Sequence, residues 1–277
     1  MNEKVIDFEL QYFLNKQKEA QEKIKNHEFQ SVIETLKEPM EKIEELANTE
    51  IYCPQNLFES AVCLNYLGKE VHQNSFAKIN FYDFYLMLAA SYYNLNKLDE
   101  SQKYYKMAIK LDPVSSIARQ YDIEIDLKNK HYDDVLNNLQ DAMYFAYTRP
   151  DIAKIYKLSG DFLRTQKDYE MSIVSYFLSI VYDINDDVAN LAKEVANEAG
   201  IDIDSEEWLS EAYMKKFFNT YKIPLMPNQK LYELAKAMGD DARSKREYKA
   251  AKFSYQLAYN LMLDDELKPV LEELSKV

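Results

Sequence analysis

The stretch YDFYLMLAASYYNLNKLDESQKYYKMAIKLDP, residues 82–113, has the pattern of two amphipathic helices joined by a short turn. On each helix, bulky and small residues alternate at the i, i+3, i+4 and i+7 spacing that places them on one face. These residues are Tyr85, Leu88, Ala89 and Tyr92 on the first helix and Ser101, Tyr105 and Ala108 on the second. Residues 94–99 form the turn, and Asp112-Pro113 closes the unit. Aromatic side chains of one helix can pack over small side chains of the other, so the stretch predicts a helical hairpin of a repeat protein.

The same pattern recurs along the chain at a nearly constant interval. Ser101, Tyr105 and Ala108 are followed one period later by Val135, Leu139 and Ala142, and after a slightly longer step by Ser172, Tyr176 and Ser179. The additional residues of the longer step enter the connection at 146–151. The hairpin that results has Tyr156, Ser159-Gly160 and Leu163 on its first helix and Tyr169, Ser172, Tyr176 and Ser179 on its second.

A further hairpin is predicted at 232–263. Its pattern residues are Leu234, Met238-Gly239, Ala242, Tyr248, Ala251, Tyr255 and Ala258. The interval from Ser172 to Ala251 exceeds two periods by about a third of a period, so one degenerate and expanded repeat lies between them. We expect its helices near 186–199 and 205–220, separated by residues 200–204.

The period from Ser101 to Val135 and this pattern resemble the tetratricopeptide repeat (TPR) family, whose repeat is about 34 residues long. The resemblance is specific at 82–113, good at 153–183 and 232–263 and weaker elsewhere, and it covers roughly two-thirds of the chain. The repeat at 116–147 departs from the family pattern, because Arg119 and Asp122 stand where an aromatic residue and a leucine are usual. The resemblance implies an all-α fold, a right-handed α-α superhelix (TPR-like solenoid) of about six helical hairpins.

The pattern divides the chain into three parts. Residues 1–80 are degenerate helical hairpins, with helices near 3–25 and 28–47 and a third helix near 55–72 that has no evident partner. Residues 81–263 are the TPR-like repeats. Residues 264–277 alternate leucines with charged residues and predict a C-terminal capping helix. Helix starts are expected where Thr148 precedes Asp151 and where Ser205 precedes Glu206-Glu207, because hydroxyl side chains cap helix N-termini.

The composition agrees with an all-helical protein and disfavours some classes of binding partner. Four Gly and 23 Tyr in 277 residues describe few tight turns and much amphipathic surface. The net charge of −13 and the pI near 4.9 disfavour nucleic acid, because a phosphate backbone would be repelled at long range. The sequence has no run of about 18 apolar residues and no leader-like N-terminus, so we expect a cytoplasmic protein without a membrane partner.

The charge is unevenly distributed. Residues 183–211 contain ten acidic residues and one lysine, whereas residues 214–252 contain ten Lys or Arg and four acidic residues. A candidate secondary basic patch consists of Arg243, Lys245, Arg246, Lys249 and Lys252. The favoured interpretation is pairing with the acidic 183–211 segment of the same chain. Binding of an acidic protein or an anionic polymer, and pairing between two molecules in a homo-oligomer, are the alternatives.

The sequence predicts no enzyme. His27, His72 and His131 are far apart, and no phosphate-binding loop or nucleophile elbow is present. Cys53 and Cys63 lack metal-ligand spacing and are interpreted as buried free thiols. We therefore expect no catalytic residue, no cofactor and no metal.

The TPR resemblance implies a binding surface on the first helix of each hairpin. That concave face would include Asp83, Leu86, Ala90, Tyr93, Ile117, Gln120, Glu124, Leu127, Lys154, Lys157, Asp161 and Arg164. Lys154, Lys157 and Arg164 share a helix stripe that could hold a carboxylate, while Leu86 and Tyr93 could accept an apolar side chain. In the competing interpretation Lys157 and Asp161 form an ordinary i,i+4 pair. The two-carboxylate clamp of some family members is not expected, because only Lys154 matches it.

These observations favour a non-catalytic scaffold or adaptor that binds a peptide or a partner helix in a concave groove. The candidate partner-binding residues are Leu86, Tyr93, Gln120, Glu124, Lys154, Lys157, Asp161 and Arg164. A peptide-responsive bacterial TPR regulator and a self-assembling structural protein are the alternatives.

Overall fold

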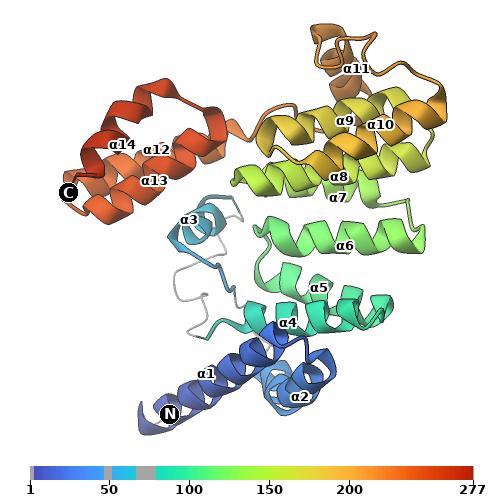
Figure 1. Ribbon diagram of the computed structural model, residues 1–277. Coiled ribbons are helices and arrows are strands. Elements are labelled where there is room, and N and C mark those ends of the chain that lie inside the picture. The colour runs from blue at the N-terminus through green and yellow to red at the C-terminus, as the bar shows by residue number, and fades with distance from the viewer. Residues whose placement is uncertain (1–2, 47–51, 67–78, 277) are drawn as a thin grey trace. The chain divides into compact units, whose positions relative to one another are not determined.

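The protein is all-helical in the part of the chain that the structure, a computed structural model, describes: residues 3–46, 52–66 and 79–276 (Figure 1). Fourteen α-helices lie in these ranges. They are α1 (Glu3–Lys25), α2 (Phe29–Leu46), α3 (Leu57–Tyr66), α4 (Phe81–Asn94), α5 (Leu98–Leu111), α6 (Ser116–Asn129), α7 (Val135–Phe145), α8 (Arg149–Thr165), α9 (Tyr169–Tyr182), α10 (Asp186–Ala199), α11 (Glu211–Tyr221), α12 (Gln229–Ser244), α13 (Tyr248–Met262) and α14 (Lys268–Leu274). The predicted all-α class is confirmed. None of the helices in these ranges has the length and apolar character needed to cross a bilayer.

The chain forms two compact units, Met1–Ile125 and Asp126–Val277. In the first, α4 and α5 pair closely, and in the second α8 pairs with α9 and α12 with α13. These three hairpins are the ones in which the sequence pattern is strongest. The division into 1–80, 81–263 and 264–277 stays a prediction.

In all three close hairpins a small residue on the first helix and a tyrosine on the second stand at the same sequence separation. The pairs are Ala89 with Tyr105, Gly160 with Tyr176, and Gly239 with Tyr255. A methyl group added at Gly160 would lie 2.5 Å from the Tyr176 ring, and one added at Gly239 would lie 2.7 Å from the Tyr255 ring. In these two hairpins the ring therefore lies directly against the partner backbone, and glycine is required for that approach.

Polar contacts fix these tyrosines and the helix that carries them. The hydroxyl of Tyr176 donates to Asp161 Oδ1 at 2.9 Å, and that of Tyr255 donates to Asp240 Oδ1 at 2.6 Å. Ser172 Oγ also donates to the carbonyl of Gly160 at 2.8 Å. Each ring is buried while its hydroxyl has a partner, which is the arrangement that a buried tyrosine requires.

The hairpin turns share one backbone conformation. Four connections have three residues each, and their central residue has a positive φ: His27 (59°), Asn96 (57°), Lys167 (62°) and Arg246 (63°). In each turn the next N–H donates to the carbonyl five residues earlier, at 2.9 to 3.0 Å, as in a Schellman motif. The longer α6–α7 connection begins with Lys130, which has a φ of 59° and follows Asn96 by one sequence period. The backbone therefore repeats with the period found in the sequence.

The hairpin at 116–147 differs in the way that its sequence indicates. Arg119 does not pack as an aromatic residue would; its guanidinium donates to the carbonyl of Pro113 at 2.7 Å. Ile123 stands at the position that holds a small residue in the three close hairpins. The residue at the tyrosine position of the second helix is Leu139, so the sequence of this hairpin lacks the small residue–tyrosine pair.

The two helices predicted between the hairpins at 153–183 and 232–263 are both present, but the second begins later than predicted. Helix α10 matches the expected 186–199, whereas α11 starts at Glu211 rather than near 205, so Ser205 caps no helix. Trp208 explains the shift, since its indole is buried and donates to the carbonyl of Ile203 at 2.7 Å, which holds the segment in turns. Helices α10 and α11 both pack on α9. The predicted cap at Thr148 is confirmed, because its side chain accepts from the N–H of Asp151.

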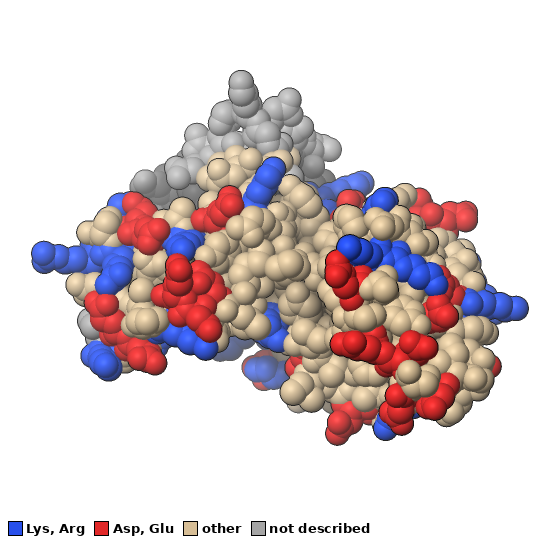
Figure 2. Space-filling view, turned by 90° about the horizontal axis from the view of Figure 1, so that it is seen from above, with Lys and Arg blue, Asp and Glu red and all other residues tan. Residues whose placement is uncertain are grey.

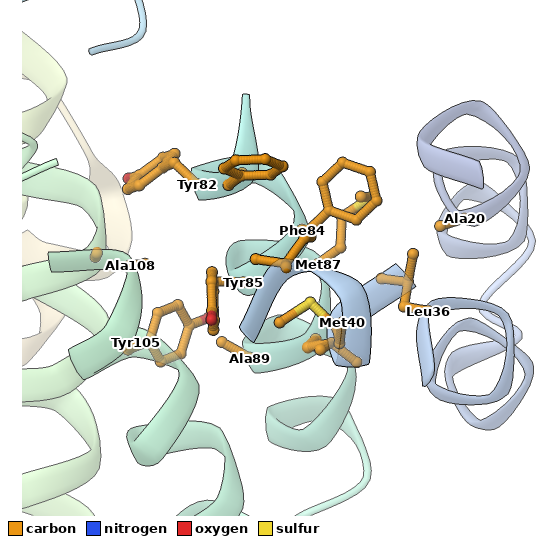
Figure 3. Packing of buried hydrophobic residues seen from close by; sticks show 14 of the residues in the cluster. Ala20, Leu36, Met40, Tyr82, Phe84, Tyr85, Met87, Ala89, Tyr105 and Ala108 are labelled. Atoms are coloured by element: carbon orange, nitrogen blue, oxygen red, sulfur yellow. The ribbon is translucent and has the colours of Figure 1, made fainter. Parts of the chain in front are cut away.

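The N-terminal helices α1 and α2 lie at their predicted positions and pack on α4. Figure 3 shows Phe84 of α4 on the side of Leu36 and Met40 of α2, whereas Tyr85 lies toward Tyr105 of α5. All of these side chains are buried in one hydrophobic cluster. Helix α4 is apolar on both sides because it is covered by a helix on each.

Helix α3, whose partner the sequence does not indicate, belongs to the corner at the end of α5. The N–H of Cys53 donates to the carbonyl of Leu111 at 2.7 Å, which ties the segment before α3 to α5. Residues 67–72 of the predicted helix lie outside the described part. Glu59 of α3 and Asp112 at the end of α5 are both buried, with exposed fractions of 4% and 0%. Burial and the neighbouring Glu59 carboxyl raise the pKa of Asp112 to about 8.

We expect the stability of the first unit to fall as pH rises toward the raised pKa of Asp112. Between 3.8, the ordinary value of the group, and about 8, the folded chain keeps a proton that the unfolded chain has lost. Lysines lower the pKa values of Glu19 and Glu38. These two carboxyl groups therefore change the stability only at pH values below this range. An Asp112→Asn variant should have a melting temperature that changes less between about pH 5 and pH 8 than that of the natural chain. If the melting temperature of the variant changed as much between these two pH values as that of the natural chain, the raised pKa of Asp112 would be contradicted.

Gly160→Ala should destabilise the second unit although alanine is the better helix former. Overpacking costs about 1–3 kcal/mol, against a gain of about 1 kcal/mol in helix propensity. Urea unfolding should therefore show a net decrease in the free energy of unfolding. In a double-mutant cycle with Tyr176→Leu, the loss caused by Gly160→Ala should shrink, because the smaller side chain leaves room for the methyl group. A Gly160→Ala chain more stable than the natural one would rule out the tight contact.

Candidate functional site

The first unit has an open pocket of about 260 Å³ between α4 and α6, with α5 at its base. The residues around it are Leu86, Ala90, Tyr93, Asn94, Tyr105, Ile117 and Tyr121. Four of them, Leu86, Ala90, Tyr93 and Ile117, belong to the surface predicted for the first helices. The structure therefore brings these predicted residues of α4 and α6 together; we call this the tyrosine pocket.

Three tyrosines shape the tyrosine pocket. The rings of Tyr105 and Tyr121 stack with centroids 5.1 Å apart and an interplanar angle of 5°. Tyr93 meets Tyr121 edge to face at 5.9 Å, and its hydroxyl donates to the carboxylate of Glu124. Burial and the Glu124 carboxylate raise the pKa of Tyr93, so its hydroxyl stays a donor. The predicted residue Glu124 therefore lies beside the pocket and holds one of its walls.

The tyrosine pocket presents apolar surface to solvent. Ile117 is 45% exposed and Tyr121 is 37% exposed, although both are large hydrophobic side chains. Gln120, a predicted partner-binding residue, is instead buried, and its amide donates to Ser116 Oγ at 3.4 Å. Gln120 therefore offers little surface at the pocket, and its role in partner binding stays a prediction. The signal for Tyr121 is its position four residues after Ile117, on the same face of α6.

The second unit has an open pocket of about 290 Å³ where α8, α9 and α10 meet. Its lining residues are Pro150, Ala153, Lys154, Lys157, Ser179, Asp183, Asn185, Asp187, Val188 and Leu191. Lys154 and Lys157, two cations of the predicted helix stripe, thus line one pocket together with two aspartates. Lys157 Nζ also lies 2.6 Å from Asp161 Oδ2, which is the i,i+4 pair of the competing interpretation.

Arg164, the third cation of the predicted stripe, is engaged with α10. Its guanidinium forms two hydrogen bonds with the carboxylate of Glu198 and approaches Glu194 at 3.5 Å. These bonds raise the pKa of Arg164 and lower that of Glu198, so both groups remain charged. The stripe expected to hold a carboxylate of a partner is thus partly used inside the unit.

The predicted basic patch is also partly neutralised, by acids other than those predicted. Arg243 Nη2 lies 2.7 Å from Glu273 of α14, and Lys245 Nζ lies 2.7 Å from Asp241. Arg246, Lys249 and Lys252 are exposed. The favoured expectation of pairing with 183–211 is therefore not met by Arg243 or Lys245. On the face shown in Figure 2, acidic and basic side chains are interspersed.

The cysteine and histidine side chains of the described residues, which are the types that often act in catalysis or bind metals, lie far apart or are buried. Burial raises the pKa values of Cys53 and Cys63 to about 11 and 12, so both remain thiols. His27 lies in the α1–α2 turn and His131 is exposed after α6, whereas His72 lies outside the described residues. Across residues 3–46, 52–66 and 79–276, no three His, Cys, Asp or Glu side chains gather as metal ligands.

Comparison with known proteins assigns no relative: no family model matches the chain, and no curated protein matches it either. The class of protein follows from the structure alone. It is an all-helical protein whose helices pack as sequential hairpins.

Charge reversal at Arg164 should destabilise the second unit. Arg164→Glu would place a third carboxylate beside Glu194 and Glu198, and the repulsion would loosen α10 from α8. The melting temperature should fall further than in Lys193→Glu, a reversal of an exposed lysine of α10. Adding Glu198→Lys should restore part of the loss by reversing the pair. Equal effects of the two single reversals would show that the Arg164–Glu198 bond contributes nothing.

Proposed function

We propose that this chain is a non-catalytic scaffold of TPR-like architecture that binds a protein or peptide partner. The sequence period, the matching period of the left-handed turn residues and the small residue–tyrosine pairs support a TPR-like solenoid. In such solenoids the first helices of successive hairpins form the recognition surface. The function then lies on α4 and α6 rather than in a buried reaction site.

The observation that carries the proposal is the tyrosine pocket. It lies between the first helices of two consecutive hairpins, and its walls are apolar side chains that remain exposed. At about 260 Å³ it is smaller than a typical pocket for a small-molecule ligand. A single side chain of a peptide or partner helix fits this size, and aromatic residues are the usual anchors of such contacts.

Site-specific photo-crosslinking in host cells tests the proposal. A benzoylphenylalanine placed at Ile117, 45% exposed in the pocket, should capture a defined partner. The same group at Phe218, 42% exposed on α11, is the matched control. Ala90→Phe would fill the pocket from its wall and should abolish the adduct at Ile117 while leaving any adduct at Phe218 unchanged.

The outcome separates the candidate functions. A captured protein or peptide that depends on an open pocket supports the scaffold. Capture of a second copy of this chain would favour the self-assembling structural protein. Adducts that form equally at both positions, or that persist in Ala90→Phe, would place recognition elsewhere.

A further inference from the structure

Two of the three close hairpins supply an acceptor for the hydroxyl of their tyrosine. Tyr176 donates to Asp161 Oδ1 at 2.9 Å, and Tyr255 donates to Asp240 Oδ1 at 2.6 Å. In both hairpins the aspartate directly follows the glycine of the first helix. The carboxylate that accepts from the tyrosine therefore stands at one fixed position of the hairpin.

The α4–α5 hairpin has the same register but lacks that carboxylate. Ser101 Oγ donates to the carbonyl of Ala89 at 2.8 Å, as the equivalent serine of α9 does to the carbonyl of Gly160. This equivalence places Ala90 at the position of Asp161. A methyl group is thus present where the other two hairpins have a hydrogen-bond acceptor.

The hydroxyl of Tyr105 has no hydrogen-bond partner among the residues that the structure describes. The side chain is only 1% exposed, and burial together with the neighbouring Tyr121 raises its pKa, so the hydroxyl stays protonated and can donate. Buried hydroxyl groups are usually hydrogen-bonded, because an unpaired one has lost its bonds with water and gained none. The α4–α5 hairpin therefore leaves a donor for which it provides no acceptor.

The tyrosine pocket contains both members of this incomplete pair. Ala90 and Tyr105 line it, together with apolar side chains such as Leu86 and Ile117. The short side chain of Ala90 leaves room where an aspartate would otherwise lie. A side chain that enters from solvent therefore contacts apolar walls and the residue whose hydroxyl has no acceptor.

We infer that the partner supplies the acceptor, through a side chain that ends in an amide or carboxylate oxygen: Asn, Gln, Asp or Glu. Its oxygen accepts from the hydroxyl of Tyr105, as Asp161 and Asp240 do from their tyrosines. Its aliphatic stem contacts Leu86 and Ile117. The inference rests on the proposed function and adds the chemistry of the residue that anchors the partner.

Titration of the full, isotopically labelled chain with three capped amino acids, followed by NMR, tests the inference. The probes are the N-acetyl amides of glutamine, glutamate and norleucine, at matched ionic strength and millimolar concentration. All three share one capped backbone, so a difference in binding belongs to the side chain. Glutamine or glutamate should shift the amide signals of 86–94 and 117–124 at a concentration at least about threefold lower than norleucine, the gain expected from one hydrogen bond.

Tyr105→Phe isolates the hydroxyl, because it keeps the ring that stacks on Tyr121. The variant should bind glutamine and glutamate no better than norleucine. Tyr176→Phe is the matched control, since its hydroxyl is bonded inside the second unit, and it should leave the shifts at 86–94 unchanged. Only Tyr176→Phe should lower the melting temperature of its unit, because only that variant loses a hydrogen bond.

Ala90→Asp tests the position of the acceptor without a ligand. It places a carboxylate where the other two hairpins have one, so it should block the probes. It should also stabilise the first unit more in the natural chain than in Tyr105→Phe, as measured by urea unfolding in a double-mutant cycle. Absence of coupling would show that an acceptor at this position does not reach the hydroxyl, and would overturn the inference.

The outcomes separate the inference from the proposed function. A preference for glutamine or glutamate that is lost in Tyr105→Phe supports the acceptor, and the preferred probe distinguishes an amide from a carboxylate. Norleucine binding as well as both, or a preference that persists in Tyr105→Phe, would overturn the acceptor while leaving a side-chain pocket in place. Absence of shifts at 86–94 and 117–124 with every probe would remove the pocket and with it the proposed function.

Discussion

The contact between a glycine and a tyrosine ring across the α8–α9 and α12–α13 hairpins is the constraint on which the fold of the second unit depends. At Gly160 and Gly239 the ring lies so close to the opposing helix that a single methyl group would collide with it. Such contact locks the register of the two helices, because moving either by one residue would bring a side chain against the ring. The hydroxyl bonds of Tyr176 and Tyr255 to aspartates then fix the rings.

Much of the fold can be predicted from the sequence because the pattern reports this contact directly. Where a glycine or alanine of the first helix pairs with a tyrosine of the second, the predicted helices agree closely with the observed bounds. The prediction fails where one side chain decides the backbone. The buried Trp208 is bonded to the carbonyl of Ile203 before α11, and the N–H of Cys53 ties the segment before α3 to the end of α5. Neither contact has a periodic signal in the sequence.

The site is harder to predict than the fold, for an electrostatic reason. The sequence shows which charges share a helix face but not which of them are neutralised by another helix. Arg164 has the spacing of a residue that faces a partner, yet it meets Glu198 of the next hairpin. The spacing of Tyr121 from Ile117 indicates the helix face that it occupies, but its stacking over Tyr105 of another helix has no signal in the sequence. Contacts between helices therefore decide which of the predicted residues remain available for recognition.

The three-residue turns have a consequence for how such a chain can change during evolution. Their left-handed central residue and their Schellman bonds fix the length of the connection inside a hairpin, so insertions there would break the small residue–tyrosine contact. The longer step of the repeat places its additional residues between hairpins, at 146–148, where no such bond is lost. Each hairpin can therefore be duplicated or exchanged as a cassette, with the linkers free to vary in length.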